Sequence, residues 1–229
     1  ALRADKFIGA AYSYEGHLNP FKLCMGFARA ALRCGAVIRT NTPVIGFETQ
    51  SGHLNAVLTT DKKYSANAVL FATGAWSGKL IAAAGSSLPM KYTHAEAIIS
   101  EPLPRVLRHH VGMTGFYEAV HGQDRTITLG VGQHQNGTLL VSNAIQQSKV
   151  IDLESTDWSM PALASALRNY FPCLSDIRIM RTWAAPSPFL PDYQPAIGWL
   201  PDFDNAYVAA GFHLAVPTIP LLSEKIVVE

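Results

Sequence analysis

The segment from Ala66 to Gly85 constrains the fold more than any other part of this chain. Residues 66–71 are almost entirely apolar on both faces of an extended chain, which is typical of a buried parallel strand. The run ends in Ala72-Thr73-Gly74, whose small side chains let the backbone approach a ligand beside the start of a short helix. The pattern predicts a layered α/β unit with a ligand-facing edge at Gly74, and a purely structural glycine turn explains it equally well.

The bulk composition excludes several classes of protein. A chain of 229 residues can bury a core, and it fits one large domain or parts of two interleaved ones. Hydrophobic residues make up 48%, charged residues 15%, and the formal net charge is +1, so we expect neither a disordered tail nor a nucleic-acid-binding surface. The apolar surplus is consistent with a surface that another segment or subunit partly covers.

No apolar run reaches the roughly 18–20 residues that a membrane-spanning helix needs. Cys24, Cys34 and Cys173 are too scattered for a disulfide framework or a metal knuckle, which favours a reducing compartment and a cytoplasmic location. Cys24 and Cys34 accompany an apolar helical pattern, and we expect them to pack in a core. His109 and His110 have no carboxylates or cysteines at ligand spacing, so no metal site is predicted.

The first part of the chain predicts a helix followed by short strands. Asn19 is a good N-cap and Pro20 suits the first helical turn, while Gly35 marks the end of the apolar helical pattern. Strands are predicted at residues 37–39, 44–47 and 56–60. A helix followed by strands in this way is typical of layered α/β proteins.

The middle of the chain has a different pattern. Alternating polar and apolar residues at 95–99 and 126–130 predict a mostly antiparallel sheet over residues 88–181. Residues 161–171 carry apolar side chains at helical spacing, and Pro172 ends that helix. The last part of the chain predicts a strand at 206–210 that ends in Gly211, which again indicates a ligand-facing edge.

Four motifs occur in order along the chain. They are Glu15-Gly16-His17-Leu18-Asn19-Pro20, the strand and turn of residues 69–77, Trp183 followed by residues 191–198, and Ala210-Gly211-Phe212-His213. Together they resemble the D-amino acid oxidase superfamily of FAD-dependent oxidoreductases, which includes glycine oxidase, sarcosine oxidase, dye-linked proline and hydroxyproline dehydrogenases, opine oxidase and hydrogen cyanide synthase. The resemblance covers nearly the whole chain.

The resemblance implies a two-domain α+β or α/β fragment, with a mixed, mainly antiparallel substrate-domain sheet and a partial Rossmann-like domain. Residues 1–87 and 182–229 would belong to the FAD-binding domain, and residues 88–181 would form the substrate-binding domain. The family seats the FAD pyrophosphate on a G-x-G-x-x-G turn, which this sequence lacks. The resemblance therefore places a nucleotide-binding segment upstream of Ala1.

The resemblance also implies two sets of site residues. Those expected to contact FAD are Val44, Ala72, Thr73, Gly74, Trp76, Ile197, Gly198, Gly211, Phe212, His213, Leu214 and Ala215. Those expected to line the substrate pocket are Phe116, Tyr117, Gln133, His134 and Ser187. His213 is the candidate catalytic residue, because an imidazole near the flavin can orient a substrate or assist a proton transfer. The alternative is that His213 serves only to space the loop.

One position departs from the family pattern. Many amino-acid oxidases of this type have W-A-G-L-R-P, in which the arginine holds the substrate carboxylate, whereas this chain has Ser187 where that arginine would be. The carboxylate is then held differently, or the substrate lacks one.

The implied reaction is oxidation of a C–N bond in a small amine, imino acid or amino acid, with hydride transfer to FAD. The alternatives are a non-catalytic subunit or assembly module of a heteromeric flavin dehydrogenase, and FAD-dependent oxidation of a hydroxy acid. Expected partners are the small-molecule substrate and other dehydrogenase subunits, through which a cytoplasmic protein would lie at the membrane periphery.

Overall fold

The computed structural model describes residues 2–12, 14, 18–115, 118, 121–122 and 125–213. Its helices are η1 (Ala4–Lys6), α1 (Pro20–Arg33), η2 (Gly74–Trp76), α2 (Ser77–Ala84), α4 (Ser159–Tyr170) and η3 (Pro172–Leu174). Its strands are β1 (Val44–Gln50), β2 (His53–Thr59), β3 (Lys63–Ser65), β4 (Val69–Phe71), β5 (Lys91–Ser100), β6 (Val111–Gly112), β7 (Thr126–Gln133), β8 (Leu139–Ser148), β9 (Ile179–Phe189), β10 (Ala196–Trp199) and β11 (Ala206–Ala210).

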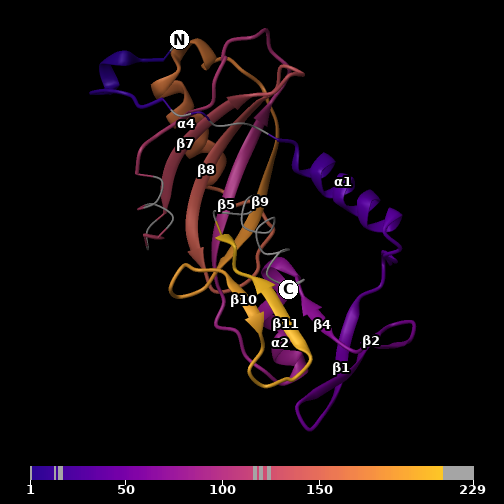
Figure 1. The fold of residues 1–229 in the computed structure, drawn as a ribbon. Coiled ribbons are helices and arrows are strands. Elements are labelled where there is room, and N and C mark those ends of the chain that lie inside the picture. The colour runs from indigo at the N-terminus through magenta and orange to yellow at the C-terminus, as the bar shows by residue number, and fades with distance from the viewer. Residues whose placement is uncertain are drawn as a thin grey trace.

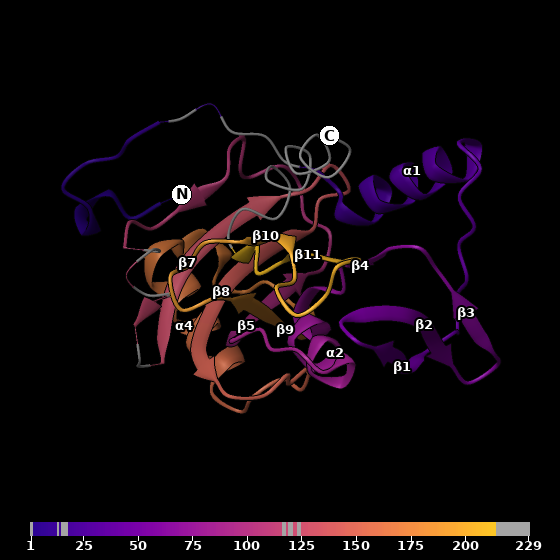
Figure 2. The same ribbon diagram turned by 60° about the horizontal axis from the view of Figure 1, so that its bottom comes forward.

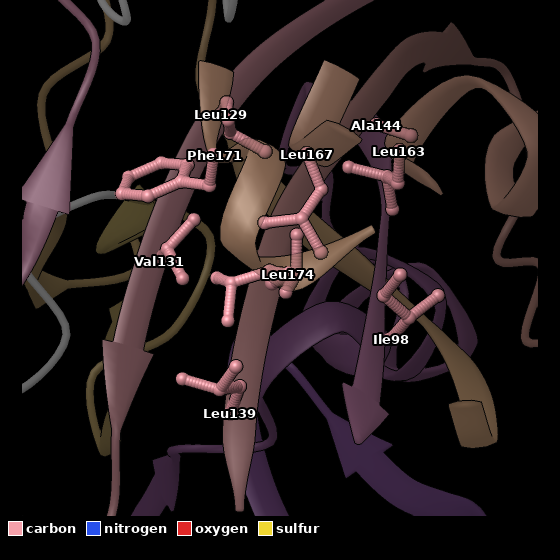
Figure 3. Packing of buried hydrophobic residues seen from close by; sticks show 10 residues of the cluster. Ile98, Leu129, Val131, Leu139, Ala144, Leu163, Leu167, Phe171 and Leu174 are labelled. Atoms are coloured by element: carbon pink, nitrogen blue, oxygen red, sulfur yellow. The ribbon is translucent and has the colours of Figure 1, made fainter. Parts of the chain in front are cut away.

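The largest sheet has five strands in the order β6-β7-β8-β5-β9, all paired antiparallel. Helix α4 covers one face of it, and its buried side chains Leu163 and Leu167 pack on strand residues such as Ile98 and Val131 (Figure 3). Both the antiparallel sheet and the helix that interrupts it are confirmed. The apolar alternation along the strands and the helical spacing after residue 159 are satisfied by the same shared core.

A second sheet has the order β10-β11-β4, with β4 parallel to β11 and β10 antiparallel to it. The predicted parallel pairing is confirmed, but the strand covers only Val69–Phe71. The predicted burial on both faces is wrong, because Leu70 is 48% exposed. Phe71 and Val208 pack with Ile81 of α2 in a second core. The short helix after the glycine turn is thus confirmed, and it holds this sheet from one side.

A third sheet, β1-β2-β3, is joined to the second by the side chain of Asn205. Its Oδ1 accepts a hydrogen bond from Leu54 N at 2.8 Å, and its Nδ2 donates to Leu54 O at 2.9 Å and Asn67 O at 3.2 Å. The amide therefore ties strand β2 to the segment before β4 and to the start of β11. Such a buried amide replaces backbone pairing where two sheets meet.

Helix α1 forms as predicted. Asn19 Oδ1 accepts from Lys22 N at 3.0 Å, and Pro20 is the first helical residue. The helix buries none of its residues, however, and both views of the fold place it apart from the five-stranded sheet (Figures 1 and 2). The predicted core position of Cys24 and Cys34 is therefore wrong, since both are exposed.

The predicted strand at residues 37–39 is also wrong, because this segment is irregular and exposed. Val37 and Ile38 favour extended backbone, but a strand needs a hydrogen-bonding neighbour. The predicted strands at 44–47 and 56–60 are confirmed as β1 and β2. No helix in the described residues is long and apolar enough to cross a membrane.

Candidate functional site

The candidate site begins at one edge of the β10-β11-β4 sheet. Parallel strands β4 and β11 end on the same side, so the turn Ala72–Gly74 and the turn Gly211–His213 leave the sheet at neighbouring points. Gly74 has φ of 55° and Gly211 has φ of 74°, conformations that side chains other than glycine rarely adopt. The structure therefore brings together two of the segments that the sequence predicts to contact a cofactor.

The first of these turns runs directly into α2. Thr73 Oγ1 and Ser77 Oγ are 3.0 Å apart and share a hydrogen bond, and Ser77 is fully buried. Trp76 is exposed, in the short helix η2 that precedes α2. The first N–H groups of α2 already have partners, because Ser77 N donates to Gly74 O and Gly78 N donates to Met90 Sδ at 3.0 Å.

The second turn ends at His213, whose side chain is 6% exposed. His213 Nδ1 lies 3.2 Å from Ser187 Oγ, within hydrogen-bond distance. Its ring centroid is 5.0 Å from that of Phe189 and 6.2 Å from that of Tyr193. Within the described part of the chain, His213 Nε2 is buried without a hydrogen-bond partner.

The surroundings of His213 disfavour its charged form. Burial, and after it the nearby His121, whose ring centroid is 5.5 Å away, lower the pKa of His213 from 6.5 to about 4. His213 is therefore a neutral imidazole at physiological pH. It can donate or accept a hydrogen bond there, but it carries no charge.

Ser187 connects this turn to the five-stranded sheet. Its register partner in β5 is Thr93, and two residues earlier in β9 Ala185 pairs with Ala95. Directly paired residues in an antiparallel sheet point to the same face. Ile98 belongs to the core under α4, so Ala95 and Ala97 lie on the opposite face.

That opposite face carries small side chains on several strands, and Trp183, which pairs with Ala97, lies on it as well. Ala97 pairs with Ser142 of β8, and Ser142 pairs with Gly130 of β7. Thr128 shares this face, is 6% exposed, and its Oγ1 has no hydrogen-bond partner in the described residues. We call this surface the small-residue face, formed by Thr93, Ala95, Ala97, Thr128, Gly130, Ser142, Ala185 and Ser187.

Gln133 and His134 are not brought to Ser187. Gln133 pairs with Leu139 at the other end of the sheet, level with the beginning of β9. Its side chain holds the loop after β5, because Oε1 accepts from Val106 N at 2.8 Å and Nε2 donates to Pro104 O at 3.0 Å. The structure thus gives Gln133 backbone partners, and the backbone N–H of His134 closes the β7–β8 hairpin.

The other predicted site residues are placed as follows. Val44 begins β1 in the third sheet, while Ile197 and Gly198 lie in β10 and pair with Ala209 and Val208 of β11. Phe212 lies between Gly211 and His213 and is partly buried. Residues Phe116, Tyr117, Leu214 and Ala215 lie outside the described part of the chain.

Sequence reasoning missed Phe189, Tyr193 and His121. The rings of Phe189 and Tyr193 stack with centroids 5.1 Å apart, because a turn after β9, closed by Tyr193 N donating to Leu190 O at 2.8 Å, folds the chain back. The Pro191-Asp192 pair is a turn signal that could have indicated this contact. No local signal places the His121 ring 3.8 Å from that of Tyr193. Among the described residues, no cluster of histidine, cysteine or acidic side chains could hold a metal ion.

Known proteins resemble this chain over most of its length. It is 24% identical to hydrogen cyanide synthase subunit HcnC of Pseudomonas aeruginosa, covering 86% of this chain and 44% of the relative. It is 26% identical to glycine oxidase of the same organism, covering 77% of this chain and 44% of the relative. The crystal structure of L-proline dehydrogenase from P. horikoshii matches with a TM-score of 0.73 and 26% identity, over 85% of this chain and 50% of that one.

The chain thus spans about half the length of the relatives that it matches. The model of the family described as FAD dependent oxidoreductase, DAO, matches residues 1–227. A match over almost the whole chain shows that this protein belongs to the DAO family of FAD-dependent oxidoreductases.

Proposed function

We propose that this chain forms the substrate-binding part, and returning pieces of the FAD-binding part, of an enzyme that oxidises the C–N bond of a small amine, imino acid or amino acid. The observation that carries the proposal is the hydrogen bond between Ser187 and His213, because it joins the cofactor-facing turn to the small-residue face. The names glycine oxidase and L-proline dehydrogenase describe relatives that act on small amino or imino acids.

The geometry of the two glycine turns fits a cofactor at the sheet edge. A side chain at position 211 would place its Cβ 3.2 Å from Leu190 Cγ, so only glycine leaves the backbone free there. We propose that Ala72, Thr73, Gly74 and Trp76 contact the ribose and phosphates of FAD, and that Gly211, Phe212 and His213 lie beside its ring. Ile197 and Gly198 would approach the same region, and Val44 the adenine end. Leu214 and Ala215 complete the predicted loop.

When bound, FAD supplies an acceptor for the hydride that leaves the carbon next to the amine. The chain's own residues bind and orient the substrate. The small-residue face is largely shielded from solvent, since Thr93 is 2% and Ala97 7% exposed and His110 Nε2 lies 3.2 Å from the position that a Cβ on Gly130 would take. The buried Phe189 ring excludes water from one end of this face. Ser187 and His213 hold a polar group of the substrate, so that its reacting carbon keeps one position.

The proposed division places residues 88–181 in the substrate-binding domain and the flanking parts in the FAD-binding domain. Strand β9 is continuous from Ile179 to Phe189, so it runs from the first region into the second. We propose that this strand fixes the position of the cofactor edge relative to the large sheet. The three free cysteines support a reducing, cytoplasmic setting.

The visible spectrum of the intact natural polypeptide tests this function. We expect a flavin absorption band at about 450 nm that is bleached when small amines or imino acids are added without oxygen. A colourless intact polypeptide would overturn the enzyme assignment. It would instead favour a non-catalytic subunit of a heteromeric dehydrogenase, a role for which the likeness to a synthase subunit is the supporting observation. Bleaching only by hydroxy acids would replace the amine substrate with that class.

A further inference from the structure

The starting point is a buried nitrogen that lacks a partner. His213 is 6% exposed, and its Nε2 makes no hydrogen bond within the described residues. A buried polar atom without a partner is unfavourable, and such atoms concentrate where a ligand completes the hydrogen bond. Ser187, which engages the opposite ring nitrogen, belongs to the small-residue face, so the imidazole borders the surface proposed to receive substrate.

The Ser187 hydroxyl allows His213 Nε2 to act either as a hydrogen-bond acceptor or as a donor. When Nδ1–H donates to Ser187 Oγ, the Nε2 atom is an acceptor. When the Ser187 hydroxyl donates to Nδ1, the Nε2–H group is a donor. Either arrangement keeps the imidazole neutral, so the pair can bind a hydroxyl, an amide or an ester carbonyl without any change of charge.

The neighbouring groups favour a neutral partner over an anion. Phe189 and Tyr193 pack around the imidazole, and Thr93 and Ala185 lie next to Ser187 on the small-residue face. Thr128, farther along the same face, contributes a second buried hydroxyl with no partner among the described residues. Apart from His121, whose ring centroid is 5.5 Å from that of His213, these neighbours are uncharged, and moving a carboxylate out of water to such groups costs far more than moving a neutral polar group.

We propose that Ser187 and His213 form a specificity pair that binds an uncharged polar group of the substrate through His213 Nε2. The preferred substrates would then be small amines that carry an amide, ester or hydroxyl instead of a free carboxylate. This inference rests on the proposed amine oxidation and adds the substrate class. His213 touches the substrate, and Ser187 positions His213.

The test compares matched substrates on the intact natural polypeptide. The pairs are glycine with glycinamide, and N-methylglycine with its amide, each supplied at the same concentration of unprotonated amine. We expect kcat/KM for flavin reduction to be at least about tenfold higher for each amide than for its acid. An equal or higher value for the acids overturns the inference. Failure of all four compounds and of other amines to reduce the flavin counts instead against the proposed function.

Variants test the role of the pair itself. Ser187→Ala should raise KM for the amides about tenfold with little change in kcat, since Nε2 then has no fixed orientation. Ser187→Arg should shift the preference toward the acids, because it places a cation beside the site. Ser175→Ala is the matched control, since Ser175 is exposed at the end of η3, before the beginning of β9, whereas Ser187 lies near the end of that strand. It should leave both parameters unchanged.

An unchanged amide-to-acid ratio in both Ser187 variants contradicts the inference. Circular dichroism and bound flavin content establish that each variant is folded. If Ser187→Arg does not fold, Ser187→Ala and the substrate pairs still decide the question.

Discussion

At the scale of single residues, His213 combines three features that rarely coincide. It is buried, it adopts a positive φ of 47°, and it bonds a serine from a different sheet. A non-glycine residue in this region of φ is unusual and is commonly held there by its surroundings. The hydrogen bond to Ser187 and the packing of the imidazole against the tilted Phe189 ring hold His213 in this conformation.

The lowered pKa of His213 predicts an acid-dependent loss of stability. The folded pKa is about 4 and the ordinary value is 6.5, so between these values the unfolded chain binds a proton that the folded chain does not. This contribution to stability is complete above pH 6.5 and is lost as the pH falls toward 4. His121 and Tyr193 are the titratable groups in contact with the ring.

The measurement is urea unfolding of the intact polypeptide at pH 7 and pH 5. We expect His213→Asn to lose less stability between these two values than the parent protein does. Equal losses in both proteins would show that His213 does not cause the pH dependence.

Gly211 allows a second prediction at this scale. Gly211→Ala forces a side chain into φ of 74° and against Leu190, so we expect the free energy of unfolding to fall by about 1–3 kcal/mol, with weaker flavin binding. Gly26→Ala is the control, since Gly26 lies in α1 with nothing within 4 Å of the added Cβ. Chemical denaturation and flavin titration should separate the two variants, and equal effects would contradict the prediction.

At the scale of elements, the N-terminus of α4 depends on one buried carboxylate. Glu96 of β5 accepts hydrogen bonds from Thr156 N at 3.0 Å and Ser159 Oγ at 2.6 Å. His94 lies on the same side of β5, and its Nε2 is 3.0 Å from Glu154 O. Glu96 thus holds the turn that precedes α4 and the hydroxyl of its first residue, and a negative charge near a helix N-terminus is favoured by the helix dipole. Strand β5 thereby fixes where α4 begins over the sheet.

Removing this carboxylate should loosen the helix on the sheet. We expect Glu96→Ala to lower the free energy of unfolding by about 3 kcal/mol, because it leaves several buried donors without an acceptor. Glu154→Ala is the control, since that side chain is exposed and only its backbone takes part in the contact. Thermal unfolding followed by circular dichroism measures both. A loss of stability for Glu96→Ala no larger than that for the control would refute the proposal that Glu96 holds the beginning of α4.

At the scale of the whole molecule, apolar surface is concentrated on α1 and the segment after it. Phe21 is 81% exposed, and Met25, Leu32 and Val37 are also exposed. An exposed apolar face on this scale normally contacts another segment or chain. The composition agrees, since 48% of the residues are hydrophobic.

Residues 1–229 expressed alone should therefore bind a hydrophobic dye and self-associate. We expect the double variant Phe21→Lys and Met25→Lys to reduce both effects, because it places charges on the exposed face of α1. Dye fluorescence and light scattering measure the change. The control is Val150→Lys, because Val150 is an exposed apolar residue between β8 and α4. If the α1 variant binds as much dye as the parent chain, the apolar surface that binds the dye lies elsewhere.

Local signals in the sequence determined most of the elements. The Asn19-Pro20 cap, the apolar run ending at Phe71 and the helical spacing before Pro172 each act within one turn or one strand, so they could be read without knowing the fold. The family resemblance then located the two glycine turns. The segment at 37–39 failed because its extended preference is satisfied only when a neighbouring strand is present.

Only the tertiary structure decided how the site is assembled. Ser187 and His213 are 26 positions apart, and they meet because the register of β9 on β5 and the end of β11 bring them to one edge. Strand register also places Gln133 at the far end of the sheet. The turn after β9 brings the rings of Phe189 and Tyr193 together. The sequence specifies which residues are present and their local preferences. Contacts between distant elements depend on strand register and on which faces pack together, and both are set by the energy of the whole core.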